Sequence, residues 1–79
     1  MDRIEKFLQQ LSKKERQIML MVLTDIKNLS LDKYDIKPLR GYKGVYRLRK
    51  GRSRVIFAKV NGMGVLIDAN FRPTIYLGL

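Results

Sequence analysis

The sequence contains no cysteine and no histidine. Without cysteine the chain can form neither a disulfide nor a thiolate metal site, and without histidine it lacks the commonest metal ligand and the commonest general base. It has no apolar run near the roughly 20 residues that cross a bilayer, and its first six residues are mostly charged. We therefore expect a cytoplasmic protein that holds no metal and no cofactor.

Acidic residues are also scarce, with 7 Asp and Glu against 17 Lys and Arg, which gives a net charge of +10 over 79 residues. A chain of this length forms one small domain, so residues 1–79 are expected to fold together. So much positive charge on so small a domain predicts a polyanionic partner. Nucleic acid is the first candidate, and an acidic protein or an anionic membrane would also satisfy the charge.

Apolar spacing in the first third of the chain predicts two short helices, one over residues 2–11 and one that begins near Lys13 after the capping box Ser12-x-x-Glu15. The predicted apolar face of the second helix consists of Ile18, Met21, Val22, Ile26 and Leu29. Three further apolar residues broaden this face, namely Met19, Leu20 and Leu23. Core packing is the favoured interpretation of these three, and a docking surface for a partner helix is the alternative.

Residues 40–57 carry the strongest pattern in the chain. Seven basic residues and no acidic one lie between Arg40 and Arg54, interleaved with β-branched and aromatic residues. If Gly51-Arg52 is the turn of a β-hairpin, opposed residues share a face of the sheet. One face then collects Tyr46, Leu48, Val55 and Phe57, and the other collects Arg47, Arg49 and Arg54. Like charges placed opposite one another destabilise a sheet, so the second face predicts an anion site.

The rest of the chain completes an antiparallel sheet. Residues 30–43 form a connection that runs extended over 35–39, and Asn61-Gly62 predicts a turn before a strand over 65–69. Strict alternation along this strand points Asp68 to the core, so either a bulge re-aims it or the strand ends earlier. A short last segment covers 74–77. The fold class expected is α+β, with an N-terminal helical hairpin packed on one face of a three- to four-stranded antiparallel sheet.

The motifs of most catalytic chemistries are missing, including a histidine-based triad, CxxC, HExxH, a Walker loop and GxGxxG. What remains is arginine, which binds phosphate through a planar fork and stabilises charge on phosphoryl oxygens. A groove formed by Arg47, Arg49, Arg54, Arg72 and Tyr76 would suit metal-free RNA cleavage by attack of a 2′-hydroxyl on the adjacent phosphate. The alternative is a solvated basic face, which is the more common meaning of a charge run.

Nearly the whole chain resembles the RelE/ParE toxin superfamily. Members read K-L-x-G, Y-R-[IVL]-R, G-x-Y-R-[IVL]-[IV]-Y and R-x-x-x-Y in this order. The matching segments are LRGYKGVYRLR over residues 39–49, RSRVIF over residues 52–57, and Phe71-Arg72 with Tyr76, preceded by the helix pair with its Leu-Ser-Lys-Lys junction at 11–14.

This resemblance implies the toxin of a toxin–antitoxin module, of the kind that cleaves mRNA on the ribosome without a metal. It implies catalytic roles for Arg47, Arg49, Arg54, Arg72 and Tyr76. We add Arg40, Lys43, Lys50 and Arg52 as expected RNA contacts, and Met19, Leu20 and Leu23 as expected contacts of a partner protein. The partners implied are a cognate antitoxin, the ribosome and mRNA, with no membrane, and the toxin–antitoxin complex is expected to be oligomeric.

Three departures from the family pattern keep alternatives open. The family usually has a strand before its helices, and here the helix comes first, so the sheet is expected to lack that strand or to receive it from a partner. Arg49 occupies a position where some members carry a lysine thought to act as a base, and arginine stays protonated. Lys43, Lys50 or Tyr76 would then have to accept the proton. Third, Arg52-Ser53 precedes Arg54 where an aromatic residue is frequent. The alternatives are a ParE-like inhibitor of DNA gyrase and a catalytically degenerate basic module that binds an antitoxin or nucleic acid.

Overall fold

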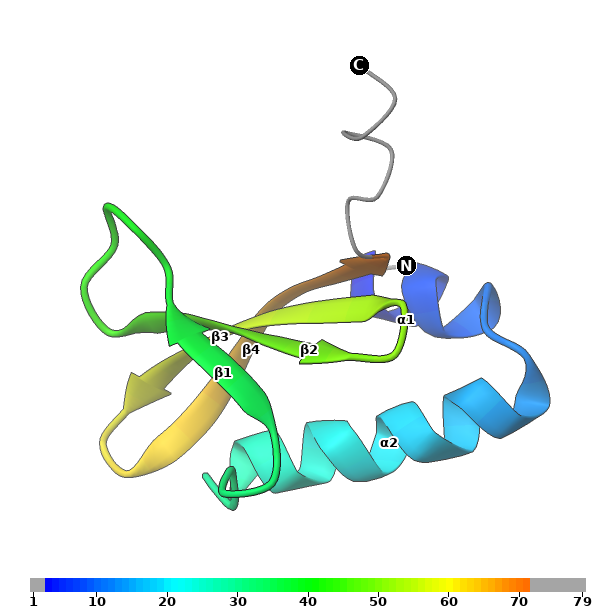
Figure 1. Cartoon of the computed structure of the whole chain (residues 1–79), viewed down its shortest axis with the longest axis horizontal. Coiled ribbons are helices and arrows are strands. Elements are labelled where there is room, and N and C mark those ends of the chain that lie inside the picture. Colours follow the sequence, from blue (N-terminus) through cyan, green and yellow to red (C-terminus); the bar gives the residue numbers. More distant parts are fainter. Residues whose placement is uncertain (1–2, 72–79) are drawn as a thin grey trace.

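The computed structural model describes residues 3–71, which form two helices and one antiparallel sheet (Figure 1). The elements are α1 (Arg3–Gln9), α2 (Lys13–Lys27), β1 (Asp35–Pro38), β2 (Val45–Lys50), β3 (Ser53–Val60) and β4 (Met63–Phe71). The strands lie in the order β1-β2-β3-β4, and both helices pack against β4. The predicted α+β class is thereby confirmed. Neither described helix is long and apolar enough to cross a membrane.

One strand of the described sheet was not predicted as a strand. Residues 35–38, predicted as an extended connection, pair with β2 and form one edge of the sheet, with Ile36 opposite Leu48. Four residues are too short a run to show alternation, but extended backbone beside an exposed strand edge completes a hydrogen-bonded ladder. The segment predicted over 74–77 lies outside the described residues, as do Arg72 and Tyr76.

The predicted β2–β3 hairpin is confirmed, register included. Lys50 pairs with Ser53, Leu48 with Val55, and the other pairs follow in step. Gly51 in the turn has a φ of 57°, a left-handed conformation that glycine adopts at little steric cost. The pairing buries Leu48, Val55 and Phe57 completely, and the ring of Tyr46 stacks on that of Phe57 with centroids 5.8 Å apart.

Helix α2 begins where the capping box predicted, but its buried face is rotated from the one expected. The buried residues are Met19, Val22, Leu23 and Ile26, at helical spacing. Ile18 and Met21 are 39% and 64% exposed. Because residues 18–23 are all apolar, periodicity fits more than one face of the helix, and packing against β4 selects the face.

Strand β4 is longer than predicted and contains a β-bulge. It begins at Met63, so Met63 and Gly64 belong to the strand rather than to the loop. Opposite Ile56 stands Asp68, and opposite the next residue, Phe57, stands Leu66, which leaves Ile67 as the extra residue. The bulge re-aims Asp68 from the core side, where strict alternation would put it, to the sheet face that lies away from the helices.

Gly64 makes the closest approach between helix and sheet. A Cβ built on Gly64 would lie 1.9 Å from the backbone carbonyl oxygen of Ile26. Ile26 is fully buried near the end of α2, so neither backbone can withdraw without opening the core.

We expect Gly64→Ala to lower the free energy of unfolding by about 1–3 kcal/mol, because the added methyl must push α2 away from β4. Urea unfolding measures the loss. Val65→Ala, at an exposed neighbouring position of the same strand, is the matched control and should cost under about 0.5 kcal/mol. Equal stability of the two variants would contradict the close approach.

Candidate functional site

The sheet face away from the helices carries two cross-strand rows of side chains. The register aligns one residue from each of the four strands in each row. The first row is Asp35, Arg49, Arg54 and Asn70, and the second is Lys37, Arg47, Ile56 and Asp68. Directly opposed residues have Cβ atoms about 4.5–5.5 Å apart. We call this surface the arginine face, and it confirms that Arg47, Arg49 and Arg54 point to one side.

Arg47 is held by a carboxylate on the neighbouring strand. Its Nη1 lies 3.4 Å from Oδ2 of Asp35 and donates to the backbone carbonyl of Asp35 at the same distance. Arg47 is only 8% exposed, whereas the side chain of Asp35 is 56% exposed. Buried charges in proteins are paired, so Asp35 neutralises and fixes Arg47. The sequence did not reveal this pair, because 35–38 was not recognised as a strand.

Arg49 lies at the centre of the first row, between Asp35 and Arg54. Its Nε is buried and has no hydrogen-bond partner within residues 3–71. An unsatisfied buried donor costs on the order of 1–3 kcal/mol, and here it belongs to a charged group. The local arrangement therefore favours an anion that accepts from this guanidinium.

Arg54, directly opposite Arg49, is held by its neighbour on the other side. Its Nε donates to Oδ1 of Asn70 at 3.2 Å, and Nδ2 of Asn70 donates to Oδ2 of Asp68 at 3.3 Å. Asp68 also accepts from the backbone N–H of Ala69 and pairs with Arg3 at 3.2 Å. Asn70 and the role of Asp68 were not predicted from the sequence, because both depend on the bulge in β4.

The four expected RNA contacts do not gather on the arginine face. Arg40 and Lys43 are exposed in the loop between β1 and β2. Lys50 is two residues from Leu48 on β2 and so points to the same face, and it lines a hollow with Ile18 of α2. It therefore lies on the helix side of the sheet. Arg52 turns toward the helices as well, where Glu15 holds it.

No family model matches the sequence, and no curated protein matches it significantly. Among solved structures, a chain in the crystal structure of the RelB–RelE antitoxin–toxin complex from Methanococcus jannaschii has a similar fold, with a TM-score of 0.70 and 22% sequence identity. The likeness covers 94% of this chain and 89% of that chain. The fold is RelE-like.

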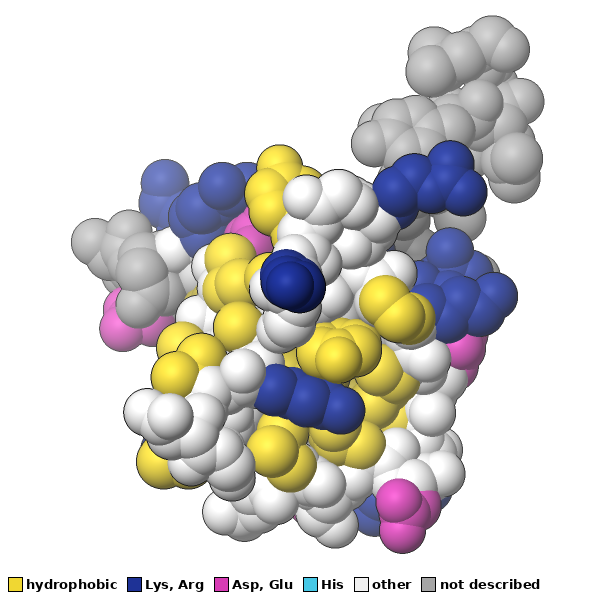
Figure 2. All heavy atoms as spheres, turned by 90° about the vertical axis from the view of Figure 1, so that its left-hand side faces the viewer, with side chains coloured by type: hydrophobic (Ala, Val, Ile, Leu, Met, Phe, Trp, Pro, Cys, Tyr) yellow, Lys and Arg dark blue, Asp and Glu magenta, His cyan; other side chains and the backbone are white. Residues whose placement is uncertain are grey.

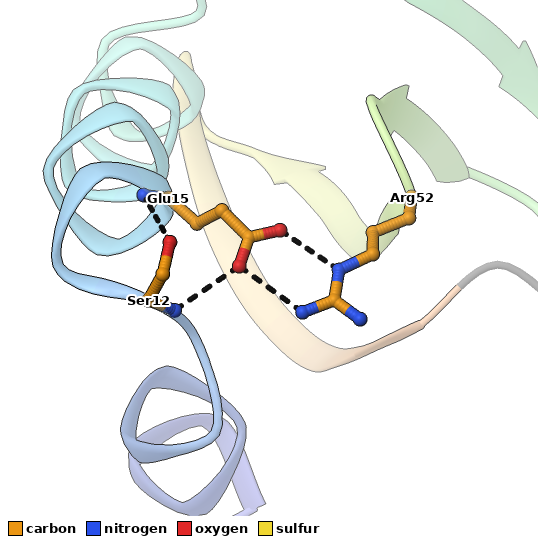
Figure 3. Close-up of polar contacts among 3 residues, drawn as sticks. All are labelled: Ser12, Glu15 and Arg52. Atoms are coloured by element: carbon orange, nitrogen blue, oxygen red, sulfur yellow. Dashed lines mark hydrogen bonds and ion pairs between the residues drawn. The ribbon is translucent and has the colours of Figure 1, made fainter.

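In this RelE-like fold the β2–β3 turn is tied to the start of α2 (Figure 3). Nε of Arg52 donates to Oε2 of Glu15 at 2.8 Å, and Nη2 donates to Oε1 at 3.1 Å. The same carboxylate accepts from the backbone N–H of Ser12, whose hydroxyl accepts from the backbone N–H of Glu15. The Arg52 guanidinium also lies 4.5 Å from the ring centroid of Phe71. Arg52 thus fastens the hairpin to the helices.

The outer side of α2 carries the exposed apolar residues that the sequence placed in the core. Two of the three expected partner contacts, Met19 and Leu23, are buried, while Leu20 is 49% exposed. A hollow of about 340 Å³ lies along α2. Its lining residues are Ile18, Met21, Val22, Lys33, Tyr34 and Lys50. Burial and a hydrogen bond to Asp25 raise the pKa of the Tyr34 hydroxyl to about 12, so this phenol stays protonated.

A second group of exposed apolar side chains lies at the end of the sheet that carries the β3–β4 turn. Figure 2 shows this side of the molecule, where hydrophobic side chains are interrupted and bordered by Lys and Arg. The exposed hydrophobic residues of the 39–44 loop, β3 and β4 are Tyr42, Val60, Met63, Val65 and Ile67. These residues border the arginine face, but their side chains are apolar and uncharged, so they form a hydrophobic patch and not an anion site.

The Glu15–Arg52 pair makes stability depend on pH in acid. Hydrogen bonds from Arg52 and from the Ser12 backbone lower the pKa of Glu15 from 4.5 to about 2. Since the folded-state pKa is the lower one, the pair stabilises the fold above about pH 4.5 and loses that contribution as the pH falls toward 2.

We expect Glu15→Gln to be less stable than the wild type at neutral pH and to approach it between pH 4.5 and 2. Glutamine keeps the capping geometry but not the charge. Thermal unfolding across this range measures the difference. Arg52→Gln should show the same trend, and the double variant should lose little more than either single one. A difference that is constant with pH would contradict the pairing.

Proposed function

We propose that this chain is the toxin of a toxin–antitoxin module and acts as a ribosome-dependent, metal-independent endoribonuclease that cleaves mRNA. The observation that carries the proposal is the opposition of Arg49 and Arg54 at the centre of the open sheet face. Two guanidinium groups held side by side favour an anion between them. The RelE-like fold and the family resemblance of the sequence support RNA as that anion.

In the proposed reaction the 2′-oxygen of a ribose attacks the adjacent phosphorus, and the bond from phosphorus to the 5′-oxygen of the next nucleotide breaks. The products are a 2′,3′-cyclic phosphate and a 5′-hydroxyl. Arg49 and Arg54 stabilise the negative charge that develops on the phosphoryl oxygens. A guanidinium group does not act as a base in proteins, so another group must accept the 2′-hydroxyl proton and a donor must protonate the leaving oxygen.

The candidates for proton transfer are Lys43, Lys50 and Tyr76, whereas Arg72, which the family pattern adds, would stabilise charge. Lys43 lies in the exposed loop that begins beside the arginine face, whereas Lys50 lies on the helix side of the sheet. Of the two described lysines, Lys43 is therefore the better placed. Arg72 directly follows β4, whose last described residue pairs with Ser53, and Tyr76 is four residues farther along the chain.

A cognate antitoxin is the proposed protein partner. The net charge of +10 favours an acidic chain. The hollow beside α2 offers Ile18 and Met21 for apolar contact, flanked by Lys33 and Lys50. An acidic amphipathic helix would satisfy both the apolar and the charged parts of this surface. We place the antitoxin there and expect the complex to be oligomeric.

A catalytically degenerate binding module is the second candidate, and one observation favours it. Of the predicted basic site residues, Arg47 is neutralised by Asp35 and Arg52 by Glu15. Fewer free guanidinium groups stabilise a phosphorane less well but still attract a polyanion. A ParE-like gyrase inhibitor would use the same fold without RNA chemistry.

Expression of the chain alone should arrest growth, and Arg54→Ala should relieve the arrest, because transition-state stabilisation by one arginine is worth on the order of 10²–10³ in rate. Mapping of mRNA 5′ ends after induction should show cuts inside codons that disappear in the variant. Lys14→Ala, which removes an exposed positive charge from α2 on the other side of the sheet, is the matched control and should stay toxic.

The same experiment separates the alternatives. Intact messages accompanied by DNA-damage signalling would point to gyrase inhibition. A wild-type chain that is harmless at high expression would favour the degenerate module.

For the antitoxin surface we expect Met21→Glu to weaken binding about tenfold, because a carboxylate in an apolar contact must lose its hydration. Where the neighbouring open reading frame encodes a small acidic protein, the measurement is a titration with that protein. Gln17→Glu adds the same charge at another exposed position of α2 and should leave the affinity within about twofold. Equal effects of the two variants would place the antitoxin elsewhere.

A further inference from the structure

The bulge in β4 places three polar groups in a line that ends on Arg54. Asp68 binds Nδ2 of Asn70, and Oδ1 of Asn70 binds Nε of Arg54. All three are partly buried on the arginine face. Without the bulge, strict alternation would turn both Asp68 and Asn70 to the core side of the sheet, and neither would lie beside Arg54.

The orientation of the Asn70 amide follows from its two neighbours. A guanidinium can only donate hydrogen bonds, and an ionised carboxylate can only accept them. The oxygen of Asn70 must therefore face Arg54, and its nitrogen must face Asp68. Asp68 is itself fixed, since its other oxygen accepts from the backbone N–H of Ala69 at 2.9 Å. Both hydrogen bonds therefore run in one direction, because Arg54 donates to Asn70 and Asn70 donates to Asp68.

This arrangement determines which atoms of Arg54 are available. Asn70 takes Nε, and no other hydrogen bond of the Arg54 side chain lies within residues 3–71. Nη1 and Nη2 thus remain for an anion. Binding through Nε also fixes the plane of the guanidinium, whereas an unrestrained arginine would have to lose rotamer freedom when it binds.

The bond does not cancel the charge. The group in direct contact with Arg54 is a neutral amide, and the carboxylate of Asp68 is one residue farther away. Arg47 shows the contrasting arrangement on the same face, where Asp35 contacts the guanidinium directly. A neutral spacer holds an arginine in place and leaves its full positive charge for a ligand.

We propose that Asn70 is a positioning residue for Arg54, oriented by Asp68, and that this line presents Nη1 and Nη2 of Arg54 to an RNA phosphate. The identity of the anion rests on the proposed function, whereas the positioning itself does not. Asn70 and Asp68 contact no phosphate in this scheme and act only through Arg54.

The positioning is tested by the side-chain NMR signal of the Arg54 Nε–H group, identified by its loss in Arg54→Lys. Its hydrogen exchange should accelerate at least tenfold in Asn70→Ala, because the hydrogen-bond acceptor is gone. Val65→Ala, on the same strand and face, should leave it unchanged. Unchanged exchange in Asn70→Ala would overturn the proposal, whatever the chain does to RNA.

Exchange of the two side-chain types gives a matched rescue. Asn70→Asp alone puts two carboxylates side by side, whereas Asp68→Asn with Asn70→Asp keeps a donor beside an acceptor and an acceptor beside Arg54. Because an acceptor again faces Nε, the double variant should show Nε–H exchange as slow as that of the wild type, in contrast to Asn70→Ala. It should also bind RNA more weakly than the wild type, since a carboxylate now contacts Arg54 directly. Failure of the double variant to restore slow exchange would argue against the line.

The RNA step is tested with a short single-stranded RNA that carries 2′-O-methyl groups and so cannot be cleaved. Asn70→Ala should bind it about fivefold more weakly than the wild type, because Arg54 must then be ordered on binding. In an Arg54→Ala background the same substitution should have no further effect. An equal loss in both backgrounds would show that Asn70 acts elsewhere. If the wild type binds no RNA, the proposed function fails, and the exchange measurement still decides the positioning.

Discussion

The register of the β2–β3 hairpin is the constraint on which the rest of the structure depends. Side chains alternate along a strand and opposed residues share a face. The pairing that buries Leu48, Val55 and Phe57 therefore forces Arg47, Arg49 and Arg54 to the opposite face. A slip by one residue would exchange the two sets and bury three guanidinium groups against the helices. The pairing that forms the core therefore also places the three arginines on the face away from the helices.

Two contacts hold the sheet against the helices, one an ion pair and the other a close approach of two backbones. The guanidinium of Arg52, in the β2–β3 turn, donates to the carboxylate of Glu15, which also caps α2. At the other end Gly64 lets β4 approach the carbonyl of Ile26. The sheet is therefore fixed against the helices at two points. These contacts help to offset the repulsion between the opposed guanidinium groups of Arg49 and Arg54 on the other face.

Much of this was predictable from the sequence, and the exceptions have physical causes. The turn at Gly51, the capping box and the Asn61-Gly62 turn are local signals, and each is confirmed. Strand β1 was missed because four residues next to Pro38 carry too short a pattern. The buried face of α2 was misplaced because an unbroken apolar run has no periodicity of its own. A bulge at Asp68 was one of two alternatives that the sequence left open, and the pairing of β3 with β4 decides for it. That this bulge also brings Asn70 beside Arg54 depends on the register and could not be predicted from a local pattern.

The distribution of charge on the arginine face argues for a ligand at its centre. At one edge Asp35 neutralises Arg47, and at the other Asn70 and Asp68 hold Arg54. Between them Arg49 keeps a buried Nε with no partner within residues 3–71. A basic surface that only kept the chain soluble would have its charges dispersed and hydrated. Here the outer arginines are fixed by protein groups and the central one is partly desolvated, which raises the free energy of the empty site and so strengthens binding of any anion that reaches it.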